Sequence, residues 1–368
     1  MTRPKASAAA PTIRIPRQTA LAAAALASAI VAGPSLAALA PPTGKTPLPA
    51  TLVRHLQGEG FTAADLSAIA GGNVVARGLP RPDRDEAGAI GVVRINLPPD
   101  AFLARFRDIV RFERGGGVDA VGRFSVPAVA ADLDGYVVPA GDATDLAGCA
   151  LDDCDINLSA PQIGRFRSVD GRGPGGRARL TAVARQALAD YVADYQRRGN
   201  EALAVYRDRE PAFALREASA RLLRQSIELH RIAPAIAFYF DRYPAAPLPA
   251  GAEEFYYWSV MSFGMKPITR ANHVVVMPVT TDGLAGFVAA SRTLYASHYF
   301  RDGLEVKYVV PVTPERTAFY LLSVNRSHSE SLTGLKGVLL GGKIRSSARS
   351  GVERHVLHVK SQAERPAP

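Results

Sequence analysis

Five stretches between residues 255 and 324 have a composition that strongly favours an extended backbone. Each is rich in Val, Tyr, Phe and Thr, and turn-forming residues separate them; they are 255–261, 273–279, 286–295, 304–312 and 317–324. β-Branched and aromatic side chains fit the pleated surface of a sheet, and short runs with turns between them are typical of an antiparallel meander. The sequence therefore predicts an antiparallel sheet in this part of the chain.

A helical pattern follows the predicted sheet. Several side chains recur there with the helical period and share one face, namely Ile344, Ala348, Val352, His355, Val356 and Val359. We therefore expect an α+β fold in which a long C-terminal helix packs on the antiparallel sheet. This order of elements resembles that of START, or helix-grip, domains. In such domains an apolar cavity between sheet and helix binds a lipid, sterol or polyketide, so the resemblance implies a ligand site of that kind.

The chain before the sheet divides into two regions. Residues 51–175 combine a strand-like run at 90–95, a helical period at 102–112 and irregular structure over 118–163, so they predict a mixed α/β N-terminal region. Residues 176–368 begin with amphipathic helices and continue into the predicted sheet and C-terminal helix. We expect the first region to pack on the second.

The N-terminus has the three parts of a secretory signal peptide. Residues 1–40 contain four basic residues, then an apolar stretch rich in Ala and Leu, then small residues. An uncleaved anchor needs about 20 strongly apolar residues, and Gly33 and Pro34 interrupt this stretch too early. Residues 41–50 are rich in proline and predict a linker. We expect a periplasmic or secreted protein.

The chain has two cysteines, Cys149 and Cys154. In an exported protein this short spacing favours a local disulfide that closes a small loop. A metal site that recruits Asp152, Asp153 or Asp155 is the first alternative, but no histidine is near in the sequence to complete it. A redox pair is the second, and its usual spacing is C-x-x-C. The sequence thus predicts a disulfide and indicates no metal and no cofactor.

The charge of the chain favours anionic partners. The formal net charge is +10, and four of the positive charges lie in residues 1–40, which contain no acid. A basic chain attracts lipid head groups or acidic polymers, so an anionic membrane surface is a candidate partner. Nucleic acid is not expected, because the chain carries no recognised nucleic-acid motif.

Two motifs follow directly on strands of the predicted sheet. Residues Tyr295–Phe300 read YASHYF, and residues Asn325–Ser327 read NRS. Both resemble signatures of a family of exported bacterial proteins without an assigned function. This resemblance therefore implies export and no particular chemistry.

We expect six residues to provide ligand contacts near the mouth of a cavity: Arg292, Tyr295, His298, Tyr299, Asn325 and Arg326. An arginine clamps a carboxylate or phosphate, and a histidine beside aromatic rings holds a polar group or acts as a general base. The structural alternatives are a hydrogen-bonded histidine inside the sheet and a surface salt bridge of Arg326 at a strand end.

Three functions remain open from the sequence. The first is a binding or carrier protein for a lipid-like amphipathic ligand. The second is a hydrolase or isomerase in which His298 is the general base and Tyr295 or Tyr299 positions the substrate. The third is an envelope scaffold without a ligand. The sequence contains neither a Gly-x-Ser-x-Gly nor a His-Glu-x-x-His motif, so it assigns no enzyme class.

Overall fold

The structure is a computed structural model that describes residues 47–365 except 81, 82, 84, 263–265, 313–315, 330, 331 and 333. The signal peptide expected over 1–40 and most of the linker expected over 41–50 lie outside the described residues. The described residues belong to one compact unit, 44–368.

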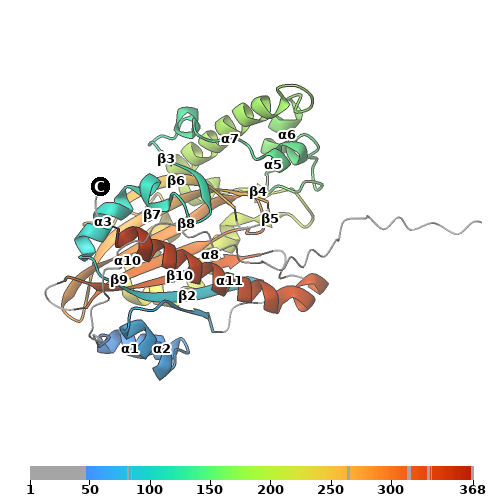
Figure 1. Cartoon of the computed structure of the whole chain (residues 1–368). Coiled ribbons are helices and arrows are strands. Elements are labelled where there is room, and N and C mark those ends of the chain that lie inside the picture. The colour runs from blue at the N-terminus through green and yellow to red at the C-terminus, as the bar shows by residue number, and fades with distance from the viewer. Residues whose placement is uncertain are drawn as a thin grey trace, which may run out of the picture. The chain divides into compact units, whose positions relative to one another are not determined.

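A large antiparallel sheet organises this unit (Figure 1). Its strand order is β1-β2-β10-β9-β8-β7-β6-β3, and all neighbouring strands run antiparallel. The strands are β1 (Val75–Gly78), β2 (Glu86–Ile95), β3 (Val118–Phe124), β6 (Glu253–Met261), β7 (Ile268–Thr281), β8 (Leu284–Ala296), β9 (Leu304–Pro311) and β10 (Phe319–His328). A separate pair is formed by β4 (Val205–Tyr206) and β5 (Phe213–Ala214). The predicted α+β fold with an antiparallel sheet is confirmed.

The first three strands join the same sheet as the last five. β2 pairs with β10 along its whole length, and β3 pairs with β6 at the opposite edge. The residues expected to form a separate N-terminal region, 51–175, therefore supply both ends of the sheet and build no sheet of their own. These pairings are long-range, so the local pattern of each segment does not reveal them.

Helices cover both faces of the sheet. They are α1 (Ala50–Gly58), α2 (Ala63–Ala70), α3 (Pro99–Arg107), α4 (Ile109–Glu113), α5 (Ala140–Leu146), α6 (Ala160–Arg167), α7 (Gly176–Arg198), α8 (Leu215–Gln225), α9 (Ile227–Ile232), α10 (Pro234–Arg242) and α11 (Gly334–Ala363), with 3-10 turns η1 (Ala130–Leu133) and η2 (Gly199–Ala202). α5 lies, and α6 begins, where the sequence predicted irregular structure, because both helices are too short to show a clear period. No helix among the described residues is both long and apolar enough to cross a membrane.

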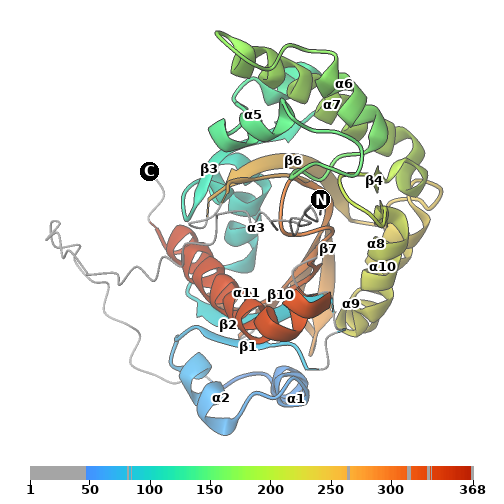
Figure 2. The ribbon, with the colours of Figure 1, turned by 90° about the vertical axis from the view of Figure 1, so that its right-hand side faces the viewer.

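The sheet curves around α3 and α11 (Figure 2). α11 packs on β2, β1 and β10, so the predicted C-terminal helix on the sheet is confirmed. The contact is tight: a Cβ placed on Gly91 would lie 2.8 Å from Cγ1 of Val352 and 2.9 Å from Cγ2 of Val356. Phenylalanine rings fill the space beneath α3, with Phe102 stacked 6.0 Å from Phe287. Packed side chains thus occupy the place where the helix-grip resemblance implies a ligand cavity.

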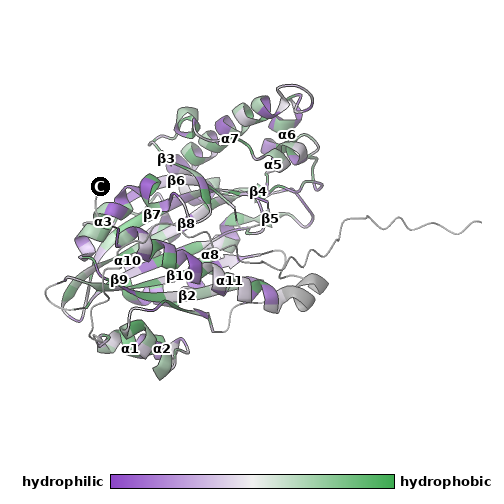
Figure 3. Cartoon of the chain, viewed as in Figure 1, coloured by the Kyte–Doolittle hydropathy of each residue, from purple (hydrophilic) through white to green (hydrophobic). Residues whose placement is uncertain are grey.

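The outer face of the sheet carries the second and larger core. α7, α8 and α10 cover it, and their apolar side chains pack on Val288, Ala290, Tyr308 and Leu322. Hydrophobic residues dominate the central strands, whereas hydrophobic and hydrophilic residues alternate along α7 (Figure 3). Polar side chains are also buried under these helices, and they form the candidate site.

Candidate functional site

A row of polar residues crosses the outer face of the sheet. Tyr256 on β6 is opposite His273 on β7, and His273 is opposite Arg292 on β8. Arg292 is opposite Leu304 on β9, which is opposite Arg326 on β10. Residues in register share one face, so these side chains all point under the outer helices. The row therefore places two arginines and a histidine in a buried layer.

The guanidinium of Arg292 meets neutral groups. Its Nε donates to Oγ of Ser219 at 2.8 Å, and its Nη1 donates to Oδ1 of Asn200 at 2.6 Å and to the Phe240 carbonyl at 3.2 Å. Arg292 is only 5% exposed. Within the part of the chain that the structure describes, no carboxylate forms an ion pair with it. A buried positive charge without a counter-charge is costly, so it favours a negative group beside it.

Arg292 lines an open pocket of about 410 Å³ between η2, α8 and the end of α10. The other lining residues are Arg198, Asn200, Glu201, Arg216, Ala220, Leu223, Phe240, Asp241, Arg242, Tyr243, Pro244 and Ala245. Ligand pockets for small molecules commonly have volumes of ~300–1,000 Å³ and combine apolar walls with a few polar groups. This pocket has both components.

The pocket rim is positively charged. Arginines outnumber carboxylates in the lining by four to two. At the rim, Arg216 lies 3.2 Å from Glu201, and Arg242 lies 3.2 Å from Asp241. These four side chains are at least half exposed, so water screens their ion pairs. The buried Arg292 is the charge that the pocket leaves uncompensated.

A hydrogen-bond chain runs behind the pocket. Nε2 of His273 lies 2.8 Å from Oε2 of Glu254, and Nδ1 lies 3.1 Å from the hydroxyl of Tyr195. Burial opposes ionisation of Glu254, but hydrogen bonds from His273, Tyr239 and Tyr256 lower the pKa of its carboxyl overall. Burial lowers the pKa of His273. The imidazole is therefore neutral, donates from Nε2 to the carboxylate and accepts at Nδ1 from Tyr195.

The second arginine of the row is paired with carboxylates. Nη1 of Arg326 donates to Oε1 of Glu86 at 2.6 Å, and Nη2 lies 4.0 Å from Oε2 of Glu228. Glu86 is 1% exposed. Arg326 is thus buried under the helices, whereas the sequence placed it at a pocket mouth or in a surface salt bridge. It has no charge to spare for a ligand.

A carboxyl pair lies next to Arg326. Burial and the hydrogen-bonded carboxyl of Glu228 together raise the pKa of Glu59 to about 7, against the opposing charges of Arg326 and Arg231. One proton shared between two carboxyls is stable where two negative charges at close range are not. This pair joins the end of α1 to α9.

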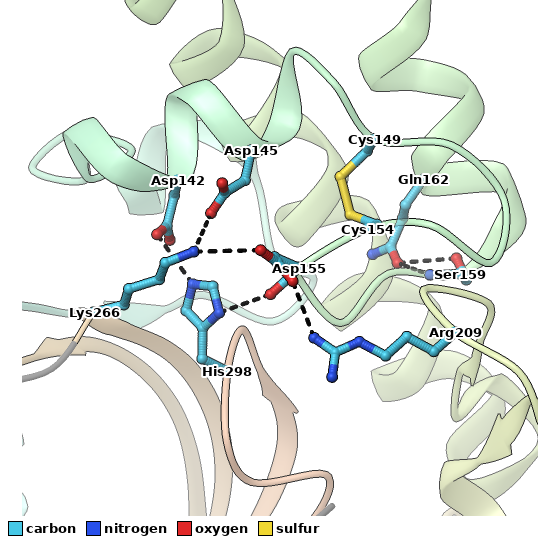
Figure 4. The surroundings of a disulfide bond; sticks show 10 residues. All are labelled: Asp142, Asp145, Cys149, Cys154, Asp155, Ser159, Gln162, Arg209, Lys266 and His298. Carbon is cyan, nitrogen blue, oxygen red and sulfur yellow. Dashed lines mark hydrogen bonds and ion pairs between the residues drawn. A yellow bond between two sulfur atoms is a disulfide. The ribbon is translucent and has the colours of Figure 1, made fainter. Parts of the chain in front are cut away.

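His298 lies in a different place, beside the disulfide (Figure 4). Its Nε2 is 3.0 Å from Oδ1 of Asp142, and its Nδ1 is 2.9 Å from the carbonyl of Asp155. The Asp155 carbonyl is an acceptor, so Nδ1 donates to it, and the carboxyl of Asp142 occupies Nε2. Protein groups thus occupy both ring nitrogens, which leaves neither of them open to a substrate. His298 is buried and hydrogen-bonded, as the structural alternative expects, but it lies after the end of β8 and not inside the sheet.

The Cys149–Cys154 disulfide is present, as predicted. Its loop is held against the segment after β4, because Nε and Nη2 of Arg207 donate hydrogen bonds to the carboxylate of Asp152 at 2.9 and 2.7 Å. The backbone N–H of Cys154 also donates to the carbonyl of Asp208 at 3.0 Å. The disulfide loop therefore fixes the chain that leads from α5 towards Asp155 and His298.

The remaining predicted residues do not join one site. Tyr295 lines a buried cavity of about 40 Å³ together with Asp142, a volume that suits ordered water and not a lipid. The chain leaves β8 after Ala296, and the hydroxyl of Tyr299 accepts the backbone N–H of Lys266 at 3.0 Å. Asn325 is half-buried on the face of β10 opposite to Arg326. Of the six predicted residues, Arg292 alone lines the large pocket.

Sequence reasoning missed a buried Asp–His pair. Nδ1 of His328 contacts both carboxylate oxygens of Asp302, at 2.9 and 2.8 Å, and both residues are 1% exposed. The alternation of β10 continues through Arg326 to His328, beyond the predicted strand end at 324. Extending this alternation past Val324 would have placed Arg326 and His328 in the buried layer.

No protein-family model matches the chain, and no curated protein matches its sequence. Among the residues that the structure describes, no group of three or more His, Cys, Asp and Glu side chains is arranged to hold a metal ion. The functional argument therefore depends on the pocket and its charges.

Proposed function

We propose that the protein binds an amphipathic ligand with an anionic group, and that this group lies against Arg292 in the large pocket. The observation that carries the proposal is the buried guanidinium with neutral partners at the wall of a pocket of about 410 Å³. Ser219, Asn200 and the Phe240 carbonyl hold the guanidinium in one orientation. An oriented, poorly hydrated guanidinium binds a carboxylate or phosphate well, because little reorganisation is needed.

The rest of the pocket lining supports an amphipathic ligand. Ala220, Leu223, Phe240 and Pro244 supply apolar surface beside the arginine. An acyl or alkyl chain on such surface gains about 0.8 kcal/mol for each buried methylene. A pocket of this size accommodates a short chain or part of a longer one, so the ligand that we propose is lipid-like and acidic.

The compartment that we propose is extracytoplasmic, either periplasmic or secreted. The disulfide between Cys149 and Cys154 supports it, since such bonds persist in oxidising compartments. The function that we favour there is that of a carrier, in keeping with the motifs that resemble an exported family. The enzyme alternative with His298 as general base loses its support, because both nitrogens of His298 face acceptors.

Native mass spectrometry of protein purified from its host tests the proposal. We expect an acidic amphiphile to co-purify, and negative-ion spectra of an organic extract to identify its head group. Ala220→Trp fills the pocket and should remove the ligand. Ala104→Trp, at an exposed position on α3, is the matched control and should retain it. Protein that carries no ligand, or Ala220→Trp protein that carries as much as the wild type, would contradict the proposal.

A further inference from the structure

Two exposed side chains depart from the burial pattern of their residue types. Of the phenylalanines that the structure describes, Phe238 alone is exposed, at 61%, and of the isoleucines Ile227 alone is exposed, at 70%. Large apolar side chains in such positions mark an interaction site when polar residues surround them. Ile227 lies on α9 and Phe238 on α10, two consecutive helices that contact each other.

We name the exposed side chains of these two contacting helices and of the adjoining end of α8 the α9–α10 face. It consists of the exposed apolar residues Ile227, Pro234, Ala235 and Phe238 and the exposed basic residues Arg224, His230, Arg231 and Arg242. Asp241 is the one acidic residue exposed between 224 and 242. Both helices lie outside the curved sheet (Figure 2), where a large flat partner can approach them.

We infer that the α9–α10 face docks on an anionic lipid membrane. The face combines apolar side chains that enter the interface with arginines that attract anionic head groups, which is the pattern of interfacial helices. α10 presents Phe238 and Arg242 one turn apart, on the same side of the helix. Charge complementarity favours a membrane over a protein partner, because the face carries three arginines and Asp241 is the one exposed carboxylate beside them.

The docked orientation places the pocket at the membrane. Asp241 and Arg242, at the end of α10, also line the pocket that contains Arg292. A membrane-embedded Phe238 therefore brings the pocket rim to the level of the head groups. An acidic amphiphile then passes between the bilayer and the pocket over a short path. This last step rests on the proposed function, whereas the docking does not.

Flotation of the protein with lipid vesicles tests the docking. The two vesicle types are pure phosphatidylcholine and phosphatidylcholine with part replaced by phosphatidylglycerol. We expect the wild type to float with the anionic vesicles, and added salt to weaken this binding. Phe238→Ser and Ile227→Ser should each weaken it about tenfold, since each removes a large apolar side chain that passes from water into the membrane interface. Arg224→Gln should weaken it about fivefold.

The control variant is Val126→Ser, which removes an apolar side chain that is 72% exposed outside the α9–α10 face. It should float like the wild type. Failure of the wild type to float, or equal losses for Val126→Ser and Phe238→Ser, would overturn the docking. Titration of each variant with monomeric dodecyl phosphate separates the two proposals. Phe238→Ser should bind it normally, whereas Arg292→Gln should bind it at least about tenfold more weakly. If Phe238→Ser loses flotation and no variant binds dodecyl phosphate, the docking stands and the proposed function fails.

Discussion

Arg292 and Arg326 are paired in register with the same residue, Leu304, and so occupy one row of the sheet on one buried face. Their surroundings differ in one respect. Arg326 contacts the buried carboxylate of Glu86 at 2.6 Å, whereas Arg292 contacts a hydroxyl, an amide oxygen and a carbonyl. Arg292, whose hydrogen-bond partners are neutral, is the one of these two arginines that lines the pocket. The charge of Arg326 stabilises the fold, and the charge of Arg292 remains available to a ligand.

This contrast predicts unequal effects of removing the two charges. Arg326→Met leaves the carboxylate of Glu86 buried without its partner and should lower the free energy of unfolding by about 3–5 kcal/mol. Arg292→Met leaves only neutral groups behind and should cost clearly less. Urea denaturation of both variants measures the difference. Equal losses in the free energy of unfolding would show that Arg292 contributes as much to stability as Arg326.

The carboxyl pair of Glu59 and Glu228 predicts a pH dependence of stability. Glu59 keeps its proton in the folded protein up to a pKa of about 7, whereas its ordinary value is 4.5. The folded state therefore binds more protons in this window, so the free energy of unfolding should fall as pH rises from about 4.5 to about 7. Glu59→Gln should remove this part of the slope.

The control for this measurement is Glu217→Gln, which changes an exposed carboxylate on α8. It should keep the slope of the wild type. Denaturation midpoints at a series of pH values measure all three proteins. An unchanged slope in Glu59→Gln would contradict the assignment of the shared proton to this pair.

His298 should matter for stability and not for ligand binding. His298→Ala leaves Asp142 buried without its partner, so we expect a loss of about 3–5 kcal/mol in the free energy of unfolding. The ligand retained by the folded fraction should equal that of the wild type. Turnover of an ester by the wild type that a His298→Ala variant of normal stability has lost would restore the general-base role.

The disulfide should be complete and moderately stabilising. Thiol titration of the denatured, unreduced protein should detect no free thiol. Replacing both Cys149 and Cys154 by serine should cost about 2 kcal/mol, because the closed loop is short. Two reactive thiols, or no change in the denaturation midpoint, would contradict this account.

The sequence predicts the parts of this fold that have a local pattern. The strands from β6 to β10 and the helix α11 follow from composition and period. The joining of β2 to β10 has no local signature, since the two strands are more than 220 residues apart in the chain. For this reason the sequence placed residues 51–175 in a region of their own.

The site is harder to predict than the fold for the same reason. His298 and Arg292 are close in sequence, but the chain leaves β8 after Ala296 and carries His298 to Asp142. The pocket of Arg292 is built by η2, α8 and α10, which come earlier in the chain than β8. Residue type alone identified Arg292, whereas only the structure shows that its partners among the described residues are neutral.

Calorimetric titration with dodecyl phosphate tests the central claim most directly. We predict that the wild type and Arg167→Gln, which changes an exposed arginine on α6, bind it, and that Arg292→Gln binds it at least about tenfold more weakly. Ala220→Trp, which leaves Arg292 in place, should also lose binding. Neutral dodecyl maltoside should bind weakly to all four proteins. Equal affinity of the wild type and Arg292→Gln for dodecyl phosphate would contradict the account.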